Sequence, residues 1–313
     1  MRGSIDIGSN SLLLLVGNFD DQGRFHEKLN LANVTGLGKN IDQTGLFSNE
    51  AMTNTLEVLR DYRSQLDKIG LPAEEILVTA TEAARVTKNA QTFFAQVRKE
   101  LGFQTQILSP QGEAYYSALG VTLGTLGKTS SQNQLLIMDL GGASTEFVEV
   151  TRDPFKVGNF VSLPIGSVRA IDWLQAGIFE QKLKDVVSQV KGRVESFDQT
   201  HLMAIAGTMT TLAAMVQGLS SYDDRRVHQS ILSQQDLKSL LEQIEPMSPA
   251  DLLKAYPFLG KRVYTIYGGA KVAYGLAQAF GMKRFEISTF GLRYGTLYSG
   301  SLRQEFVIGS GQK

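Results

Sequence analysis

One short pattern occurs twice in this sequence, at its beginning and again near its middle. In each copy an apolar run ends in an aspartate, a turn with glycine and serine follows, and a second apolar run begins; the copies span residues 3–20 and 135–150. Apolar runs interrupted by a glycine turn predict β-hairpins. The repeat indicates a weak internal duplication, and two such hairpins facing each other would form a cleft.

The rest of the first half alternates between helix-like and strand-like segments. Apolar residues recur at helical spacing over residues 48–69 and 88–101, and short buried-strand runs cover residues 76–80 and 105–108. This alternation predicts an α/β fold, in which helices pack on a mixed or parallel sheet.

The length of 313 residues predicts two domains. Residues 124–134 are small and polar, which is typical of a domain boundary. We therefore predict an N-terminal domain at residues 1–124 and a C-terminal domain at residues 125–313. The last helix of the second domain could pack back on the first.

The composition excludes several classes of function. Lys+Arg and Asp+Glu are equal at 31 each, so the overall charge does not favour nucleic acid or an anionic membrane as a partner. The absence of cysteine excludes disulfides, thiolate metal sites and a cysteine nucleophile. The chain shows no targeting segment, and its apolar run at Leu12–Val16 is far shorter than the roughly 20 residues of a membrane helix. We expect a soluble, cytoplasmic protein.

The two glycine turns carry the strongest chemical signal. Glycine lets backbone N–H groups approach an anion closely, and successive N–H groups in a tight turn suit a phosphate. The aspartates that precede the turns, Asp6 and Asp139, would repel a phosphate, so they imply a bridging divalent cation, for which magnesium is suited. The alternative is that each turn only joins two strands. The candidate phosphate contacts in the two turns are Gly8, Ser9, Asn10, Ser11, Gly141, Gly142, Ala143, Ser144 and Thr145.

Six segments together resemble one known family. DIGSNS, TATEAARVTKNA, the Glu113-Ala pair, DLGGASTE, AGTMTTLAAM and FGLRYG occur in this order in the exopolyphosphatase and guanosine pentaphosphate phosphohydrolase (Ppx/GppA) family. The resemblance covers nearly the whole chain, in the short two-domain form of the family. It implies two ribonuclease-H-like domains of the actin-like ATPase superfamily, with the active site in an interdomain cleft.

The resemblance also implies roles for particular residues. Glu113 matches the catalytic carboxylate that orients or deprotonates the attacking water, and Arg85 matches an arginine that grips phosphate. Without the family, Glu113 is better explained as a helix N-terminal charge and Arg85 as a surface ion pair. Asp139 and Glu146 match metal-linked acids, to which we add Asp6. The family's third phosphate loop corresponds to Gly207 and Thr208.

The implied activity is magnesium-assisted hydrolysis that releases orthophosphate from the end of inorganic polyphosphate, guanosine pentaphosphate or both. Another divalent cation could replace Mg²⁺, and K⁺ could assist. The resemblance further implies a homodimer. The alternative from another class is a non-catalytic sensor of guanosine tetraphosphate, and an ATP-dependent kinase of the same superfamily is less favoured.

Four positions depart from the family's usual pattern. This chain has Gly112 and Tyr294 where the family usually has glutamate, and Ala143 and Ala206 where it usually has glycine. These differences bear on the choice of substrate more than on the class of reaction. The short form also makes a short or small substrate more plausible.

Overall fold

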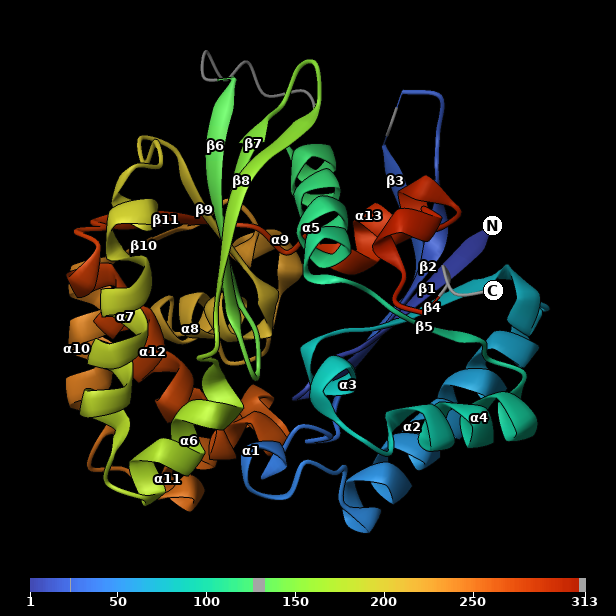
Figure 1. The fold of residues 1–313 in the computed structure, drawn as a ribbon, viewed down its shortest axis with the longest axis horizontal. Helices are drawn as coiled ribbons and strands as arrows, with labels where there is room; N and C mark the ends of the chain where they lie inside the picture. The colour runs from blue at the N-terminus through green and yellow to red at the C-terminus, as the bar shows by residue number, and fades with distance from the viewer. Residues whose placement is uncertain (23, 126–132, 310–313) are drawn as a thin grey trace. The chain divides into compact units, whose positions relative to one another are not determined.

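The computed structural model describes residues 1–22, 24–125 and 133–309. The chain divides into two compact units, Met1–Gly127 with Phe290–Lys313, and Lys128–Thr289. Each unit has its own β-sheet with helices packed on it (Figure 1). The predicted α/β class is therefore confirmed. No helix in the described ranges has the length and apolar character needed to cross a membrane.

The first unit contains a five-stranded sheet in the order β3-β2-β1-β4-β5. The first three strands run antiparallel, whereas the last two run parallel to β1. At the β2–β3 turn, the Asp20 carboxylate accepts hydrogen bonds from the N–H groups of Gln22 and Arg24, which holds the turn closed. The strands are β1 (Arg2–Ile7), β2 (Ser11–Phe19), β3 (Phe25–Val34), β4 (Ile76–Ala80) and β5 (Thr105–Ile107).

The helices of the first unit begin at recognisable capping residues. Ser48 caps α2 by accepting the N–H of Ala51, and Ser109 caps α5 by accepting the N–H of Gly112. Tyr62 of α2 is buried and donates its hydroxyl to the carbonyl of Leu12, which attaches the helix to the sheet. The helices are α1 (Ile41–Thr44), α2 (Asn49–Lys68), η1 (Ala73–Glu75), α3 (Glu82–Val86), α4 (Ala90–Leu101), α5 (Pro110–Gly124), α13 (Leu292–Ser299) and η3 (Gln304–Phe306).

The second unit contains a six-stranded sheet in the order β10-β11-β9-β6-β7-β8. Strands β6, β7 and β8 are antiparallel, β9 is parallel to β6, and β11 is parallel to β9. The strands are β6 (Gln134–Leu140), β7 (Thr145–Thr151), β8 (Lys156–Leu163), β9 (Leu202–Ile205), β10 (Ile231–Ser233) and β11 (Arg284–Ile287).

The helices of the second unit share one large apolar core with its sheet. Two of them start with a capping box, in which a serine and the aspartate three residues later exchange hydrogen bonds with backbone N–H groups: Ser233 with Asp236, and Ser248 with Asp251. The helices are α6 (Ser167–Gln175), α7 (Phe179–Glu195), α8 (Ala206–Val216), α9 (Asp224–Val227), α10 (Gln234–Ile244), α11 (Pro249–Ala255), η2 (Pro257–Tyr264) and α12 (Ile266–Ala279).

The two sheets repeat the same plan, as the internal duplication predicts. In both, an antiparallel three-stranded meander is followed by strands parallel to its first strand. The turn between the first two strands is also the same: the N–H of Gly8 donates to the carbonyl of Ser11, and the N–H of Gly141 donates to that of Ser144, both at 3.0 Å.

The end of the chain returns to the first unit. Helix α13 packs on α5, β1 and β2, so residues 290–313 group with the N-terminal half, whereas the expected boundaries placed them in residues 125–313. Two glycines make the α5–α13 contact possible. A Cβ on Gly120 would overlap the carbonyl of Gly291, and one on Gly295 would overlap the carbonyl of Tyr116.

We expect Gly120→Ala to lower the free energy of unfolding by about 1–3 kcal/mol, because the added methyl group meets backbone that cannot rotate away. The matched control is Gly192→Ala in α7, where nothing lies within 4 Å of the new Cβ; this change should raise stability by up to about 1 kcal/mol. Urea unfolding followed by circular dichroism measures both. Equal effects of the two substitutions would contradict the close contact.

Candidate functional site

The candidate residues of the first unit follow the carboxyl ends of its parallel strands. Asp6 is the penultimate residue of β1, Arg85 lies on α3 just after β4, and Glu113 lies in the first turn of α5 after β5. Because parallel strands end at the same edge of a sheet, these three segments gather there. The structure thus brings together residues from three separate motifs.

Arg85 and Glu113 form a buried ion pair. Nη1 of Arg85 lies 2.7 Å from Oε2 of Glu113 and also donates to the carbonyl of Leu108 at 2.9 Å. Nη2 of Arg85 donates to Oε2 of Glu82, also at 2.9 Å. The side chains of Arg85, Glu113 and Glu82 are only 8%, 12% and 20% exposed. In this arrangement the guanidinium of Arg85 orients Glu113. That Arg85 also binds a phosphate stays a prediction.

Burial raises the pKa of the Glu113 carboxyl above its ordinary value, because a low-dielectric environment disfavours the charged form. The charge of Arg85 opposes this rise, while the nearby charge of Glu82 adds to it. For Arg85 itself, burial favours loss of the proton, but the two carboxylates outweigh burial and raise its pKa. A carboxylate with increased proton affinity, held by a permanent cation, is suited to accept a proton from water.

The first glycine loop is held by its carbonyl groups. The carbonyl of Ser9 accepts the N–H of Gly38 at 2.7 Å, and that of Asn10 accepts the N–H groups of Thr35 and Gly36 at 3.0 and 3.1 Å. Gly38 permits this approach, since a Cβ there would lie 2.7 Å from the Cβ of Ser9. The loop is therefore fixed in shape before any ligand arrives.

The second glycine loop is held in the same way by α6. The carbonyl of Gly141 accepts the N–H of Ser167, and the carbonyl of Gly142 accepts those of Val168 and Arg169. The guanidinium of Arg169 donates to the carbonyl of Ala143. Within the described part of the chain, the N–H groups of Gly142 and Ala143 donate no hydrogen bond. These two N–H groups are thus available to an anion.

Thr145 differs from the other predicted contacts of this loop. Its side chain is completely buried, and its hydroxyl donates to the carbonyl of Ile165 at 2.6 Å. The hydroxyl hydrogen is therefore used within the protein. In this structure Thr145 stabilises the loop and does not offer its hydroxyl to a ligand.

Asp139 and Glu146 face each other across the β6–β7 hairpin. They are directly paired in the antiparallel register, so their side chains project from the same face of the sheet. Oε1 of Glu146 accepts the hydroxyl of Ser162 at 2.8 Å. Over the residues described, no cluster of three or more histidine, cysteine or acidic side chains could hold a metal by itself. The pair fits a magnesium ion that takes its other oxygens from phosphate and water.

The third loop is the first turn of α8. This helix follows β9, the strand next to β6 in the sheet. Asp139 of β6 is paired with Ile205 at the end of β9, and α8 follows immediately. No side chain caps the helix, so its first N–H groups are offered as at other anion-binding helix ends. Gly207 leaves room for the guanidinium of Arg262, which a Cβ would overlap. Gly207 and Thr208 lie in the first turn of α8, and their contact with phosphate stays a prediction.

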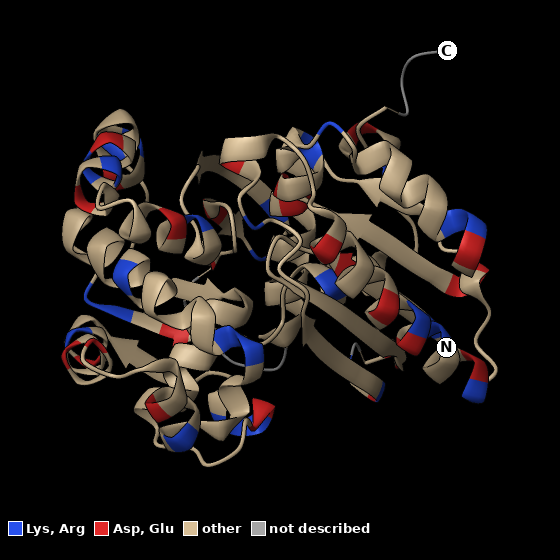
Figure 2. Cartoon of the chain, turned by 90° about the horizontal axis from the view of Figure 1, so that it is seen from below, with Lys and Arg blue, Asp and Glu red and all other residues tan. Residues whose placement is uncertain are grey.

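Sequence reasoning missed several side chains that complete these arrangements. Glu82 lies three residues before Arg85 on the same helix, a spacing that could have suggested their contact. Arg262 and Arg169 reach their loops from elsewhere in the second unit, and no local pattern marks them. Figure 2 shows basic and acidic residues interspersed on the outer helices, so charge distribution does not mark them either.

Two of the four departures from the family pattern have a structural reason. Gly112 packs against η3, because a Cβ there would lie 2.7 Å from the Cβ of Phe306. Tyr294 is buried and stacks on Phe290 with ring centroids 3.9 Å apart. At Ala206 the backbone has φ of 71°, a left-handed conformation that favours glycine, so the structure gives no reason for alanine there. It gives none for the methyl group of Ala143 either.

Known proteins are similar to this chain over most of its length. Residues 20–304 match the model of the Ppx/GppA phosphatase family. Exopolyphosphatase 2 of Mycobacterium tuberculosis is 30% identical over 292 residues, covering 88% of this chain and 89% of that protein. A bifunctional 3-dehydroquinate synthase/phosphatase of Fusobacterium nucleatum is 28% identical over 302 residues; the match covers 90% of this chain but only 44% of that longer protein.

Solved structures show the same fold. The Aquifex aeolicus member of the Ppx/GppA family is 27% identical, with 95% of this chain and 96% of that chain covered and a TM-score of 0.72. An exopolyphosphatase from Cytophaga hutchinsonii, at 23% identity and a TM-score of 0.82 over 95% of this chain and 96% of that chain, supports the fold alone. The predicted class of two ribonuclease-H-like α/β domains is confirmed.

We expect Ala206→Gly to raise the free energy of unfolding by about 1 kcal/mol, because it relieves the left-handed conformation. The control is Ala214→Gly in the buried middle of α8, which should lower it by at least about 1 kcal/mol. Urea unfolding of both variants tests the pair. A loss of stability in Ala206→Gly would show that the conformation is not strained.

Proposed function

This chain belongs to the Ppx/GppA phosphatase family, and from that premise we propose that it is an exopolyphosphatase-type hydrolase with Glu113 as its general base. The observation that carries this assignment is the buried contact of Glu113 with Arg85, close to Glu82. Two acids and one arginine are costly to bury together, and such clusters are frequent at functional sites. Burial raises the pKa of Glu113 above its ordinary value, which gives the carboxylate the proton affinity that a base requires.

The proposed substrate is inorganic polyphosphate, guanosine pentaphosphate or both, cleaved at the terminal phosphoanhydride bond. The similarity to exopolyphosphatase 2 over 88% of this chain favours polyphosphate. The N–H donors of the glycine loops bind anionic oxygens, so they support a polyphosphate-type anion without distinguishing the two substrates.

In the proposed reaction, water attacks the terminal phosphorus while Glu113 accepts a proton from that water. The new P–O bond forms as the bridging P–O bond breaks, and orthophosphate and the shortened chain leave. Arg85 orients Glu113, and the N–H groups of Gly142 and Ala143 and of the first turn of α8 bind phosphoryl oxygens. Asp139 and Glu146 would hold Mg²⁺, which when bound neutralises charge on the phosphates.

We expect Glu113→Gln to lower kcat by roughly 10²–10⁴ with KM nearly unchanged, because the amide keeps the shape but cannot accept the proton. The measurement is phosphate release, with magnesium, from tripolyphosphate, long-chain polyphosphate and guanosine pentaphosphate. Glu57→Gln on the exposed face of α2 is the matched control. Wild-type turnover by Glu113→Gln on every substrate would contradict the role of Glu113, and no turnover by the wild-type protein would contradict the proposed activity.

The pH profile tests the environment of Glu113 separately. Glu113 must be deprotonated to act, and its pKa lies above the ordinary value of 4.5, so the acid limb of kcat/KM should also lie above that value. Glu82→Gln removes a negative charge that raises this pKa, so the acid limb should move to lower pH. Arg85→Gln removes the charge that lowers it, so the limb should move to higher pH. Both profiles are compared with Glu57→Gln; an acid limb that moves in neither variant would exclude Glu113 as its source.

A further inference from the structure

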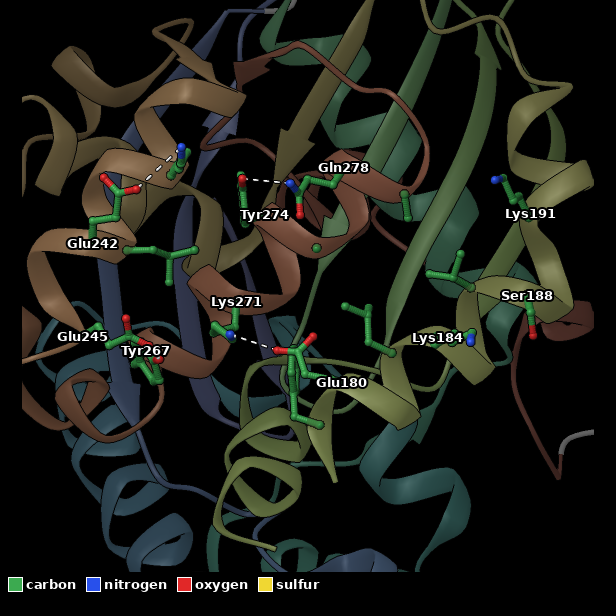
Figure 3. A pocket seen from close by; sticks show the side chains of 17 residues that line it. Glu180, Lys184, Ser188, Lys191, Glu242, Glu245, Tyr267, Lys271, Tyr274 and Gln278 are labelled. Atoms are coloured by element: carbon green, nitrogen blue, oxygen red, sulfur yellow. Dashed lines mark hydrogen bonds and ion pairs between the residues drawn. The ribbon is translucent and has the colours of Figure 1, made fainter. Parts of the chain in front are cut away.

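Three helices of the second unit line a groove that the proposed reaction does not use. Helices α7, α10 and α12 enclose a volume of about 730 Å³, with side chains from all three pointing into it (Figure 3). The lining includes none of the residues assigned above to catalysis or phosphate binding. Its volume is within the range of natural ligand-binding sites.

The floor of the groove belongs to α12 and combines aromatic with polar side chains. Tyr267, Lys271, Tyr274 and Gln278 of this helix follow one another at intervals of three or four residues, so they form one stripe along it. Tyr267 and Tyr274 are half-buried, together with Leu183 and Val187 of α7. These side chains are packed on the core of the unit but still present apolar surface to the groove.

The two walls of the groove differ in the sign of their net charge. The α7 side carries Lys184 and Lys191 with Glu180, and the α10 side carries Glu242 and Glu245 with Lys238 (Figure 3). Lys184 makes no ion pair with any residue that the structure describes. The nearest acid to Lys191 is Glu195 at 3.7 Å, and both are about half exposed. The lysine wall is therefore only weakly neutralised.

Several internal contacts hold the other polar groups in place. Lys271 pairs with Glu180 at 3.0 Å, and Lys238 pairs with Glu242 at 3.7 Å. The hydroxyl of Tyr267 donates to Glu245 at 2.7 Å. Burial, with the nearby carboxylate of Glu245, raises the pKa of Tyr267 to about 12, so the hydroxyl keeps its proton. Even after these contacts, the two walls differ in the sign of their exposed charge.

We propose that this groove binds an amphipathic α-helix of a partner protein, which carries acidic residues along the edge facing α7 and basic residues along the edge facing α10. The wall residues recur at helical intervals, at positions 184, 188 and 191 on α7 and at 238, 241, 242 and 245 on α10. Such rows accept the side-chain rows of another helix. The apolar stripe of the partner then covers Tyr274, Leu183 and Val187.

The test uses three labelled synthetic peptides of about 18 residues, long enough to be helical when bound. All three share an apolar stripe at helical spacing. The mixed peptide has glutamates on one flank of the stripe and lysines on the other. The all-lysine peptide has lysines on both flanks, and the all-glutamate peptide has glutamates on both. Fluorescence anisotropy with the full chain should give a Kd on the order of 10 µM for the mixed peptide. The other two should bind about fivefold more weakly, as expected for two lost surface ion pairs.

Reversing the lysine wall should exchange the preference. Lys184→Glu with Lys191→Glu makes both walls acidic, so this variant should bind the all-lysine peptide more tightly than the mixed one. Lys182→Glu with Lys254→Glu changes the net charge equally at exposed positions outside the groove and should keep the wild-type order. Circular dichroism confirms that both variants are folded.

Three results would overturn the proposal. The first is equal binding of all three peptides to the wild-type protein, and the second is binding of none at millimolar concentration. The third is a sedimentation coefficient that changes in the Lys184→Glu, Lys191→Glu variant and not in the control variant. That result would show that the groove is a contact between copies of this chain. None of these results would affect the proposed hydrolysis, because phosphate release is assayed separately.

Discussion

The candidate chemistry depends on one hydrogen bond that closes the glycine turn in each unit. The N–H of Gly8 donates to the carbonyl of Ser11 in the first unit, and the N–H of Gly141 donates to that of Ser144 in the second. This bond sets the register of the two strands on either side. In the second unit it places Asp139 opposite Glu146; in the first it leaves the carbonyls of Ser9 and Asn10 to the segment at residues 35–38. Because the carbonyls are engaged from one side, the loop N–H groups can serve an anion without reorganisation.

The contact between Arg85 and Glu113 combines two opposing effects. Burial and the charge of Glu82 raise the pKa of Glu113, while Arg85 lowers it. A buried carboxylate without the arginine would bind its proton too firmly to act as a base, and an exposed one would hold a proton too weakly. Arg85 also pairs with Glu82, so its own position is fixed from two sides. The same three side chains thus control both the orientation and the proton affinity of Glu113.

Two departures from the family pattern, Gly112 and Tyr294, are explained by the residues that pack against them. Gly112 precedes Glu113 and has no side chain because the C-terminal segment at Phe306 occupies that space. That segment also accepts the N–H of Ser109, the cap of the helix that carries Glu113. Tyr294 belongs to an aromatic cluster with Phe290 and Phe25. These residues are explained by packing, so they do not by themselves indicate a changed reaction.

The sequence by itself determined the two hairpins, the α/β class and the placement of Asp6, Asp139 and the glycine turns, because these follow from local periodicity and turn chemistry. Motif order also selected Arg85 and Glu113, although not their contact. Only the tertiary structure decided that Arg85 meets Glu113, that the Thr145 hydroxyl is used internally, and that residues 290–313 return to the first unit. Each of these depends on residues distant in sequence meeting at short range, as Gly120 and Gly295 do, and no local pattern encodes such a meeting.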